Sequence, residues 1–247
     1  MPNLKLEIEY DGSGYCGWQV QHPRKNQKTI QDTIEKALRQ ILRERVRLIA
    51  SGRSDAGVHA FAQVANFHTR VNIPLDKLQR GLNSLLPQDI VVKKITEANP
   101  HFHSRFDAKS KVYRYTILNR PYPAAIRRND VYHYRFPLDV KLMRKEAQAL
   151  LGRHNFSAFA ASGSKSKDAV RSIKAIKVVK DGDCIHIEAE ADGFLYNMAR
   201  NITGTLIEIG RGRFPKGSMK RILAGRDRRL AGPTAPAQGL CLVKVRY

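Results

Sequence analysis

The order of strand-like and helix-like segments is the feature that most constrains the fold of this chain. In the first hundred residues, alternating apolar positions predict strands and apolar positions three or four residues apart predict helices. The predicted strands are 4–9, 45–50, 61–68 and 90–95, and the predicted helices are 29–42 and 74–86. Their order, β-α-β-β-α-β, is that of a ferredoxin-like or RRM-like unit, an antiparallel sheet with both helices on one face.

The second half repeats this kind of alternation with insertions. We predict strands at 111–118, 131–136, 171–179, 184–191 and 240–245, helices at 138–151, 194–209 and 216–224, and a loop at 153–168. Asp181-Gly182 favours a hairpin turn. No linker rich in Pro, Gly or Ser separates the halves. We therefore predict an α+β fold of two ferredoxin-like or RRM-like subdomains, residues 1–106 and 107–247, whose antiparallel sheets join into one extended sheet around a central cleft and form a single body.

The charge of the chain points to a polyanionic partner. Its 44 Lys and Arg residues against 22 Asp and Glu residues leave a net charge of +22, spread along the 247 residues. Such an excess favours binding of nucleic acid through its phosphates. An anionic membrane surface is the main alternative, which the absence of a basic amphipathic helix with exposed aromatic side chains disfavours. The basic tract 22–28 is interpreted as a loop that faces RNA or solvent.

The sequence gives little support for a metal, a disulfide framework or a nucleotide cofactor. Cys16, Cys184 and Cys241 are widely spaced and odd in number, so we expect reduced packing residues. The histidines that could suggest a metal are His59, His101 and His103, but no further ligand stands at a fixed spacing. Phosphate-binding glycine motifs are absent. No signal peptide or membrane-spanning run is found, and we expect a cytoplasmic protein.

A polar loop between two predicted strands, residues 51–60, is the first candidate site. Arg53 and Asp55 stand two residues apart between Gly52 and Gly57. An arginine beside an aspartate lowers the pKa of the carboxyl group, and an ionised carboxylate can act as a nucleophile or base. We expect Arg53 to hold Asp55 charged and aimed. The alternative from this stretch alone is a turn closed by an ordinary ion pair.

Two further groups of residues allow a functional and a structural interpretation. Tyr113 shares a strand face with Tyr115, and either ring could stack on a base or simply reflect the preference of tyrosine for strands. Asn197, Arg200 and Gly204 form one face of the predicted helix 194–209. That face is either solvated, or it directs Arg200 into the cleft to pair with a carboxylate or phosphate.

Several motifs in this order resemble the TruA family of tRNA pseudouridine synthases over nearly the whole chain. The nearest match is Gly52-Arg53-Ser54-Asp55-Ala56-Gly57-Val58-His59-Ala60. It is accompanied by Tyr10-Asp11-Gly12, Gly17-Trp18-Gln19, Leu82-Asn83, Leu86-Pro87-Gln88-Asp89-Ile90, Phe102-His103-Ser104-Arg105-Phe106, the pair Tyr113 and Tyr115, Asn155-Phe156-Ser157-Ala158-Phe159, Gly193-Phe194-Leu195 with Arg200 and Gly204, and Gly239-Leu240. Ser54, Asn155 and Trp18 replace the more common Thr, Asp and Phe of the family.

The resemblance implies an isomerase that converts uridine to pseudouridine at positions 38, 39 and 40 of the tRNA anticodon stem-loop, as a homodimer without a cofactor. It assigns Asp55 as the nucleophile on a flipped-out uridine, Arg53 and Arg200 as ion-pairing and positioning residues, and Tyr113 as the stacking residue. The atom that Asp55 reaches stays open between C1′ and C6 of the nucleotide, with proton removal from C2′ as the third possibility. The alternatives are a non-catalytic RNA-binding protein built from tandem RRM-like units and a pseudouridine synthase with other RNA targets.

Overall fold

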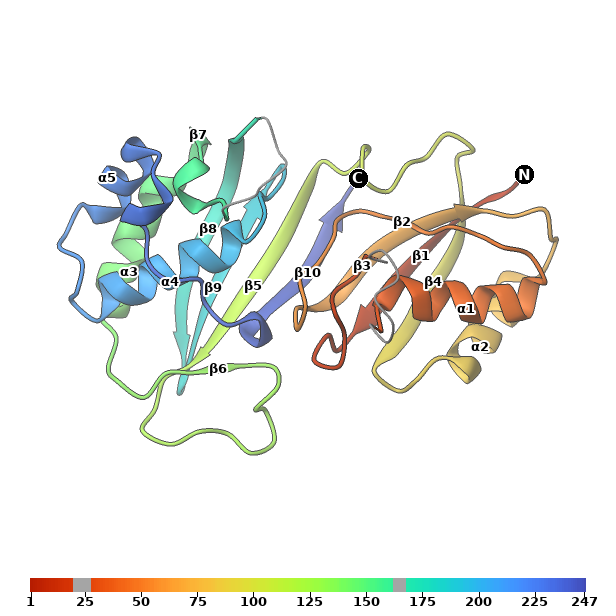
Figure 1. The fold of residues 1–247 in the computed structure, drawn as a ribbon, viewed down its shortest axis with the longest axis horizontal. Coiled ribbons are helices and arrows are strands. Elements are labelled where there is room, and N and C mark those ends of the chain that lie inside the picture. The colour runs from red at the N-terminus through yellow and green to blue at the C-terminus, as the bar shows by residue number, and fades with distance from the viewer. Residues whose placement is uncertain (20–27, 162–167) are drawn as a thin grey trace. The chain divides into compact units, whose positions relative to one another are not determined.

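The computed structural model describes residues 1–19, 28–161 and 168–247 and divides the chain into two compact units (Figure 1). The first unit comprises residues 1–109 and 242–247, and the second comprises residues 110–241. Most of the basic tract 22–28 and part of the predicted loop 153–168 lie outside the described residues.

The last six residues belong to the first unit, although the sequence placed them in the second subdomain. The backbone N–H of Lys109 donates to the carbonyl of Arg246 at 2.8 Å, and the Tyr247 hydroxyl donates to the carbonyl of Ser104 at 2.8 Å. The ring of Tyr247 packs 4.9 Å from that of Phe102, centroid to centroid. These contacts join distant parts of the sequence and have no signature in local periodicity.

The first unit is built on a sheet with the strand order β4-β1-β3-β10. Its strands are β1 (Asn3–Tyr10), β2 (Ile49–Ala50), β3 (His59–His68), β4 (Ile90–Ala98) and β10 (Leu240–Arg246). β1 pairs antiparallel with both β3 and β4, and β2 pairs antiparallel with β3. The antiparallel sheet predicted for this half is therefore confirmed.

β2 is shorter than the predicted strand 45–50. The backbone of Leu48 is bonded to side chains of the first helix: its N–H donates to Glu35 Oε1 at 2.8 Å, and its carbonyl accepts from Gln31 Nε2 at 3.3 Å. These side chains take the hydrogen bonds that a neighbouring strand would otherwise supply. The alternating pattern is present, but only Ile49 and Ala50 join the sheet.

Both helices of the first unit lie side by side against the sheet (Figure 1). They are α1 (Ile30–Leu42) and α2 (Leu75–Leu85), close to the predicted ranges. α1 begins after Thr29, whose hydroxyl accepts from the N–H of Asp32 at 3.3 Å and so caps the helix. α2 approaches α1 where Gly81 faces Ile41.

The second unit holds a sheet with the strand order β5-β9-β8-β7. These strands are β5 (Ser110–Leu118), β7 (Gly152–Asn155), β8 (Val170–Asp181) and β9 (Cys184–Ala191), and the two-residue β6 (Tyr132–His133) pairs parallel with β5. β9 pairs antiparallel with β5 and with β8, which confirms the hairpin around Gly182. β7 lies in the predicted loop 153–168, because a four-residue strand is too short to show a period.

The helices of the second unit are α3 (Val140–Ala147), α4 (Met198–Gly210) and α5 (Ser218–Gly225), with 3₁₀ turns at Gln148–Leu150, Ser157–Phe159, Arg228–Leu230 and Ala237–Gly239. α4 starts four residues later than predicted, because Asn197 adopts a left-handed conformation with φ of 60°. A left-handed residue cannot continue a right-handed helix.

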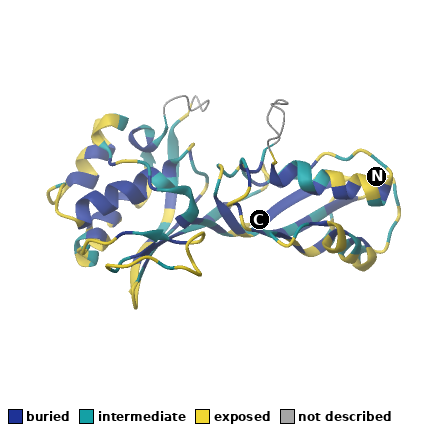
Figure 2. Ribbon diagram, turned by 60° about the horizontal axis from the view of Figure 1, so that its bottom comes forward, coloured by how far each residue is buried: buried dark blue, intermediate teal, exposed yellow. Residues whose placement is uncertain are grey.

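Buried side chains line the strands and the inner sides of the helices, whereas exposed residues lie on the outer sides (Figure 2). α4 is the most deeply buried helix, with its residues from Asn201 to Gly210 all buried. Among the described residues, no helix is both long enough and apolar enough to cross a membrane.

Candidate active site

Asp55 lies in a tight loop, residues 51–58, between β2 and β3; we call it the Asp55 loop. The N–H of Val58 donates to the carbonyl of Asp55 at 3.2 Å and closes a four-residue turn. Gly57, the third residue of this turn, has φ of 78°, a conformation that glycine adopts without steric cost. The Asp55 side chain is half-buried. The turn therefore displays one carboxylate from the end of a rigid strand.

The base of the Asp55 loop is anchored by a buried glutamine on β3. The hydroxyl of Ser51, which is fully buried, donates to Gln63 Oε1 at 2.7 Å, and Gln63 Nε2 donates to the carbonyl of Gly52 at 3.0 Å. The N–H of Ser51 also donates to the carbonyl of Val64 at 2.8 Å. Because buried polar groups are costly to leave unpaired, these bonds fix the path of the chain into the loop.

A second loop, residues 11–18, packs against the Asp55 loop and leaves no room for side chains at two of its glycines. A Cβ on Gly12 would lie 2.1 Å from the carbonyl oxygen of Val58, and one on Gly17 would lie 2.4 Å from that of Ser54. The N–H of Trp18 donates to the carbonyl of Ser54 at 3.1 Å. This backbone contact supports both ends of the turn that carries Asp55.

The side chain of Tyr10 also contacts the Asp55 loop, and the ring of Trp18 packs near that of Tyr10. The Tyr10 hydroxyl lies 2.8 Å from Ser54 Oγ, and either oxygen can donate. Serine keeps the hydroxyl of the more common threonine, so this hydrogen bond survives the departure from the family pattern. The Trp18 ring is buried with its centroid 6.0 Å from that of Tyr10. Trp18 is therefore a packing residue of this loop.

His59 links the two loops through one ring nitrogen. Its Nδ1 lies 3.1 Å from the N–H nitrogen of Gly12 and 3.1 Å from Asp11 Oδ1. Without a proton on Nδ1 the ring accepts from Gly12, and with one it pairs with Asp11. Burial raises the pKa of the Asp11 carboxyl group, but hydrogen bonds from Ser13 and the neighbouring His59 outweigh it and leave that pKa lowered.

The predicted ion pair between Arg53 and Asp55 is wrong. Arg53 is exposed and takes part in none of the ion pairs formed among the residues that the structure describes. Two residues of separation in a turn do not by themselves bring two charged groups together. The guanidinium of Arg53 is exposed to solvent.

Tyr113 lies on β5 with its ring half-buried against another aromatic ring. The ring centroids of Tyr113 and Phe194 are 4.9 Å apart with planes at 78°, an edge-to-face contact that is favourable for aromatic pairs. Tyr115, two residues further on the same strand face, is fully buried and donates its hydroxyl to the carbonyl of Pro236 at 2.8 Å. Burial raises the pKa of Tyr115. Of the two tyrosines, only Tyr113 keeps an accessible ring.

Arg200 projects from the first turn of α4, and its guanidinium donates to two groups of the same unit. Its Nε donates to the carbonyl of Ala235 at 2.7 Å, and its Nη1 donates to Asn197 Oδ1 at 3.0 Å. Gly204 on the same face is buried: a Cβ there would lie 1.7 Å from the carbonyl oxygen of Pro233. The face of Asn197, Arg200 and Gly204 is therefore partly covered by chain: Gly204 is buried, and Asn197 and Arg200 are half-buried.

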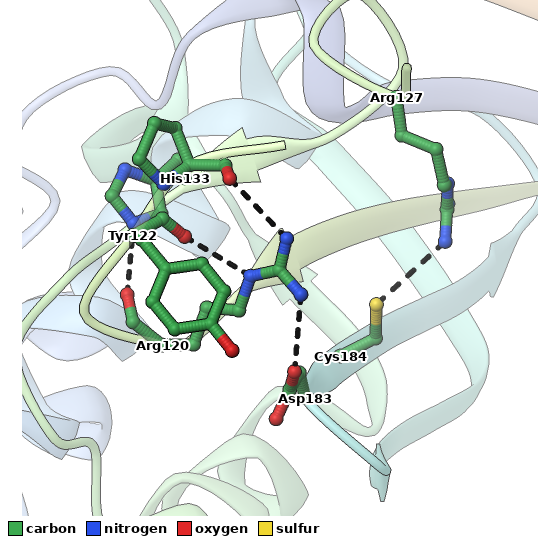
Figure 3. Close-up of polar contacts among 7 residues, drawn as sticks. Arg120, Tyr122, Arg127, His133, Asp183 and Cys184 are labelled. Atoms are coloured by element: carbon green, nitrogen blue, oxygen red, sulfur yellow. Dashed lines mark hydrogen bonds and ion pairs between the residues drawn. The ribbon is translucent and has the colours of Figure 1, made fainter. Parts of the chain in front are cut away.

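A separate polar cluster stabilises the connection between β5 and β6 (Figure 3). Arg120 donates to the carbonyls of Tyr122 and Pro123 at 3.0 and 3.2 Å and pairs with Asp183 at 3.3 Å. A hollow of about 400 Å³ lies beside it, lined by Leu118, Arg120, Ala124, Ala125, Ile126, Arg127, Val131, Asp183 and Cys184. None of the predicted site residues lines this hollow. Over the described ranges, no group of three or more His, Cys, Asp and Glu side chains could hold a metal.

Comparison with known proteins identifies the family. A family model described as tRNA pseudouridine synthase matches residues 7–107 and 147–247, well over half of the chain. The chain belongs to the tRNA pseudouridine synthase family. Its relatives are therefore enzymes that form pseudouridine in tRNA. Asp55 and Arg200 lie within the matched segments. Tyr113 lies outside them, so its assignment depends on the local pattern of β5.

Full-length relatives support the same conclusion. The chain is 47% identical over 247 residues to tRNA pseudouridine synthase A of Acetivibrio thermocellus, with all of both chains covered. It is 48% identical over 248 residues to tRNA pseudouridine synthase A of Ruminiclostridium cellulolyticum, also with both chains fully covered. A chain from a crystal structure of a Cbf5-Nop10-Gar1 complex is 14% identical, with 97% of this chain and 58% of that one covered; its TM-score of 0.31 is too low to carry an argument.

Several supporting residues of the site were not predicted as site residues. Tyr10, Gly12 and Gly17 stand in motifs that the family resemblance contains, so those motifs were the available signal. Gln63 lies on β3 in a run of otherwise apolar or small residues. A buried polar residue in such a run indicates a hydrogen-bonded role, but it does not identify the partner.

The packing of the two loops predicts opposite outcomes for two neighbouring glycines. Gly17→Ala places a Cβ against the Ser54 carbonyl at a φ of 90°, so we expect a loss of roughly 1–3 kcal/mol in the free energy of unfolding. Gly14→Ala meets no atom within 4 Å and is expected to change that free energy by less than about 0.5 kcal/mol. Urea unfolding of the full chain measures both. Equal stability of the two variants would contradict the close backbone approach.

Proposed function

We propose that this protein isomerises uridine to pseudouridine at positions 38, 39 and 40 of the tRNA anticodon stem-loop. The observation that carries the proposal is the Asp55 loop: a single half-buried carboxylate on a turn that is supported by backbone contacts at both ends. Membership of the tRNA pseudouridine synthase family and the net charge of +22 support tRNA as the substrate. The three positions follow from the motif resemblance.

The reaction exchanges bonds within one nucleotide. The N1–C1′ glycosidic bond breaks, the uracil turns, C5 forms a bond to C1′, and the proton of C5 is lost while N1 gains one. Atoms and electrons balance without an oxidant, a reductant or an energy source. The target base must leave its stack, which costs a few kcal/mol and is offset by phosphate contacts of basic residues.

We assign Asp55 as the nucleophile of this reaction. A carboxylate can form a covalent intermediate that divides one difficult step into two. Asp55 can attack C1′, add to C6 or remove a proton from C2′. Each of these steps needs the Asp55 carboxylate beside the target nucleotide, so its assignment does not depend on which of them occurs.

Arg53, Arg200 and Tyr113 are assigned to substrate binding. The exposed guanidinium of Arg53 suits a backbone phosphate, which accepts two parallel N–H bonds from arginine. Arg200 enters with its orientation already set by Ala235 and Asn197, so it loses little conformational freedom on binding. Tyr113 offers a ring held edge-to-face by Phe194, on which the displaced base can stack.

The assembly and location of the protein are proposed from the family resemblance. We propose that the chain acts as a homodimer in the cytoplasm, on tRNA and without a small-molecule cofactor.

Removal of the carboxylate charge tests the nucleophile. We expect Asp55→Asn to bind tRNA with unchanged affinity but to lose turnover by about 10³-fold or more, because an amide cannot serve as nucleophile or base. Tritium release from tRNA that carries 5-³H-uridine measures turnover, and filter binding measures affinity. Substantial residual turnover in a verified Asn variant would eliminate the assignment of Asp55.

Two substitutions of Tyr113 separate stacking from hydroxyl chemistry. Tyr113→Phe keeps the ring, whereas Tyr113→Leu removes a stacking contact that contributes ~1–3 kcal/mol. We therefore expect a larger loss of kcat/KM for the Leu variant than for the Phe variant. If both variants lose the same amount, the hydroxyl group and not the ring is the functional part, for example in removing the C5 proton.

The set of modified positions tests the substrate assignment. Pseudouridine maps of total tRNA from cells with and without this protein should differ only at positions 38, 39 and 40. Restoration by wild-type protein and not by Asp55→Asn provides the control. Differences at other positions would indicate a synthase with other targets, and identical maps would indicate a non-catalytic RNA-binding protein.

A further inference from the structure

The segment 231–236, here called the strap, crosses α4 with its backbone in direct contact with the helix. A Cβ on Gly204 would lie 1.7 Å from the carbonyl oxygen of Pro233, and a Cβ on Gly232 would lie 2.8 Å from that of Gly204. The N–H of Gly232 donates to Thr205 Oγ1 at 2.9 Å. Because neither crossing glycine has room for a Cβ, the strap occupies one defined path across the helix.

A buried polar node fastens the strap to α4. Asn201 is fully buried, and its Oδ1 accepts from Thr234 Oγ1 at 2.6 Å and from Arg228 Nη2 at 3.1 Å. Its Nδ2 donates to the carbonyl of Phe159 at 2.7 Å. One asparagine on the helix thus connects the strap, the 3₁₀ turn before it and the core of the unit.

Arg228 completes this node from the turn that precedes the strap. Its Nη1 donates to the carbonyl of Gly232 at 2.9 Å, and its Nη2 also lies 3.2 Å from Thr234 Oγ1. Burial lowers the pKa of the Arg228 guanidinium. No carboxylate of the described residues forms an ion pair with it. A partly buried guanidinium that bonds only to neutral acceptors gains little net stability, because no ion pair offsets the free energy of removing its charge from water. Its hydrogen bonds do fix the positions of the groups that they join.

The strap contacts Arg200 through the backbone of Ala235. The carbonyl of Ala235 accepts from Arg200 Nε at 2.7 Å, while its N–H donates to the carbonyl of Arg200 at 3.2 Å. The guanidinium of Arg200 is therefore oriented by a backbone atom of the strap, one residue away from Thr234. We propose that Asn201, Arg228 and Thr234 act as positioning residues for the reaction by fixing the strap that orients Arg200. This inference rests on the proposed function of Arg200.

A change in the position of the Arg200 guanidinium should change the rate of the reaction. A displacement of a catalytic or substrate-orienting group by about 1 Å can lower the rate by about 100-fold. The Thr234 hydroxyl is the smallest part of the node that can be removed, since valine has nearly the same shape as threonine. Its loss leaves Asn201 Oδ1 and Arg228 Nη2 without one partner each and frees the strap next to Ala235.

The experiment compares Thr234→Val with Thr234→Ser in the full chain. We expect Thr234→Val to lower kcat for pseudouridine formation on tRNA by about 10-fold or more, with KM changed by less than about twofold. Thr234→Ser keeps the hydroxyl and should restore most of kcat. Thr69→Val is the control: the hydroxyl of Thr69, like that of Thr234, donates to a side-chain oxygen, here Glu44 Oε2 at 2.8 Å, and Thr69 follows the end of β3 opposite to the Asp55 loop. Thr69 is fully buried, whereas Thr234 is half-buried. Thr69→Val should lower thermal stability without lowering kcat.

A double-mutant cycle separates positioning from a structural role. If Thr234 acts through Arg200, then Thr234→Val causes no further loss of kcat when it is added to Arg200→Ala. If the two losses multiply, Thr234 does not act through Arg200 and the inference is overturned, while the proposed role of Arg200 stands. If Arg200→Ala alone keeps wild-type kcat, the proposed role of Arg200 fails first and the inference fails with it.

Discussion

The contact on which the candidate site depends most is the approach of the 11–18 backbone to the Asp55 loop. It consists of main-chain atoms: the N–H of Trp18 on the carbonyl of Ser54, and two glycines that leave no space for a Cβ. Main-chain contacts of this kind have no rotamers to lose, so they define the position of a turn better than flexible side chains do. The same 11–18 segment also contacts the start of α1, where the N–H of Ile30 donates to the carbonyl of Gly17.

The second unit uses the same device around Arg200. Gly204 and Gly232 allow the strap to cross α4 at backbone distance, and a carbonyl of the strap then orients the guanidinium. In both units a charged side chain is presented by a backbone that glycine allows to approach another backbone closely. This common arrangement explains why glycines accompany the charged residues in each motif. The chemistry of the motif needs the charge, and the geometry needs the absence of a side chain.

Local periodicity predicted the helices and most of the strands, because these elements bury one face and that face repeats in the sequence. The failures occur where tertiary contacts override the pattern. Residues 45–48 alternate like a strand, but the backbone of Leu48 is bonded to side chains of α1 instead of to a strand. Residues 194–197 continue a helical pattern, but the left-handed Asn197 delays the start of α4. The Arg53–Asp55 ion pair failed for a related reason, since proximity in sequence says nothing about direction within a turn.

The amino-acid sequence was sufficient for the α+β class, the basic character and the family, since each depends on composition, on periodicity or on motifs that can be read along the chain. The site itself is different. Three features of the site depend on contacts that local sequence does not show. Gln63 anchors the Asp55 loop, and Tyr115 is buried while Tyr113 is accessible. Asn201 and Arg228 bind the strap at Thr234. Only the folded chain brings them together, because hydrogen bonds between distant residues leave no periodic trace in the sequence.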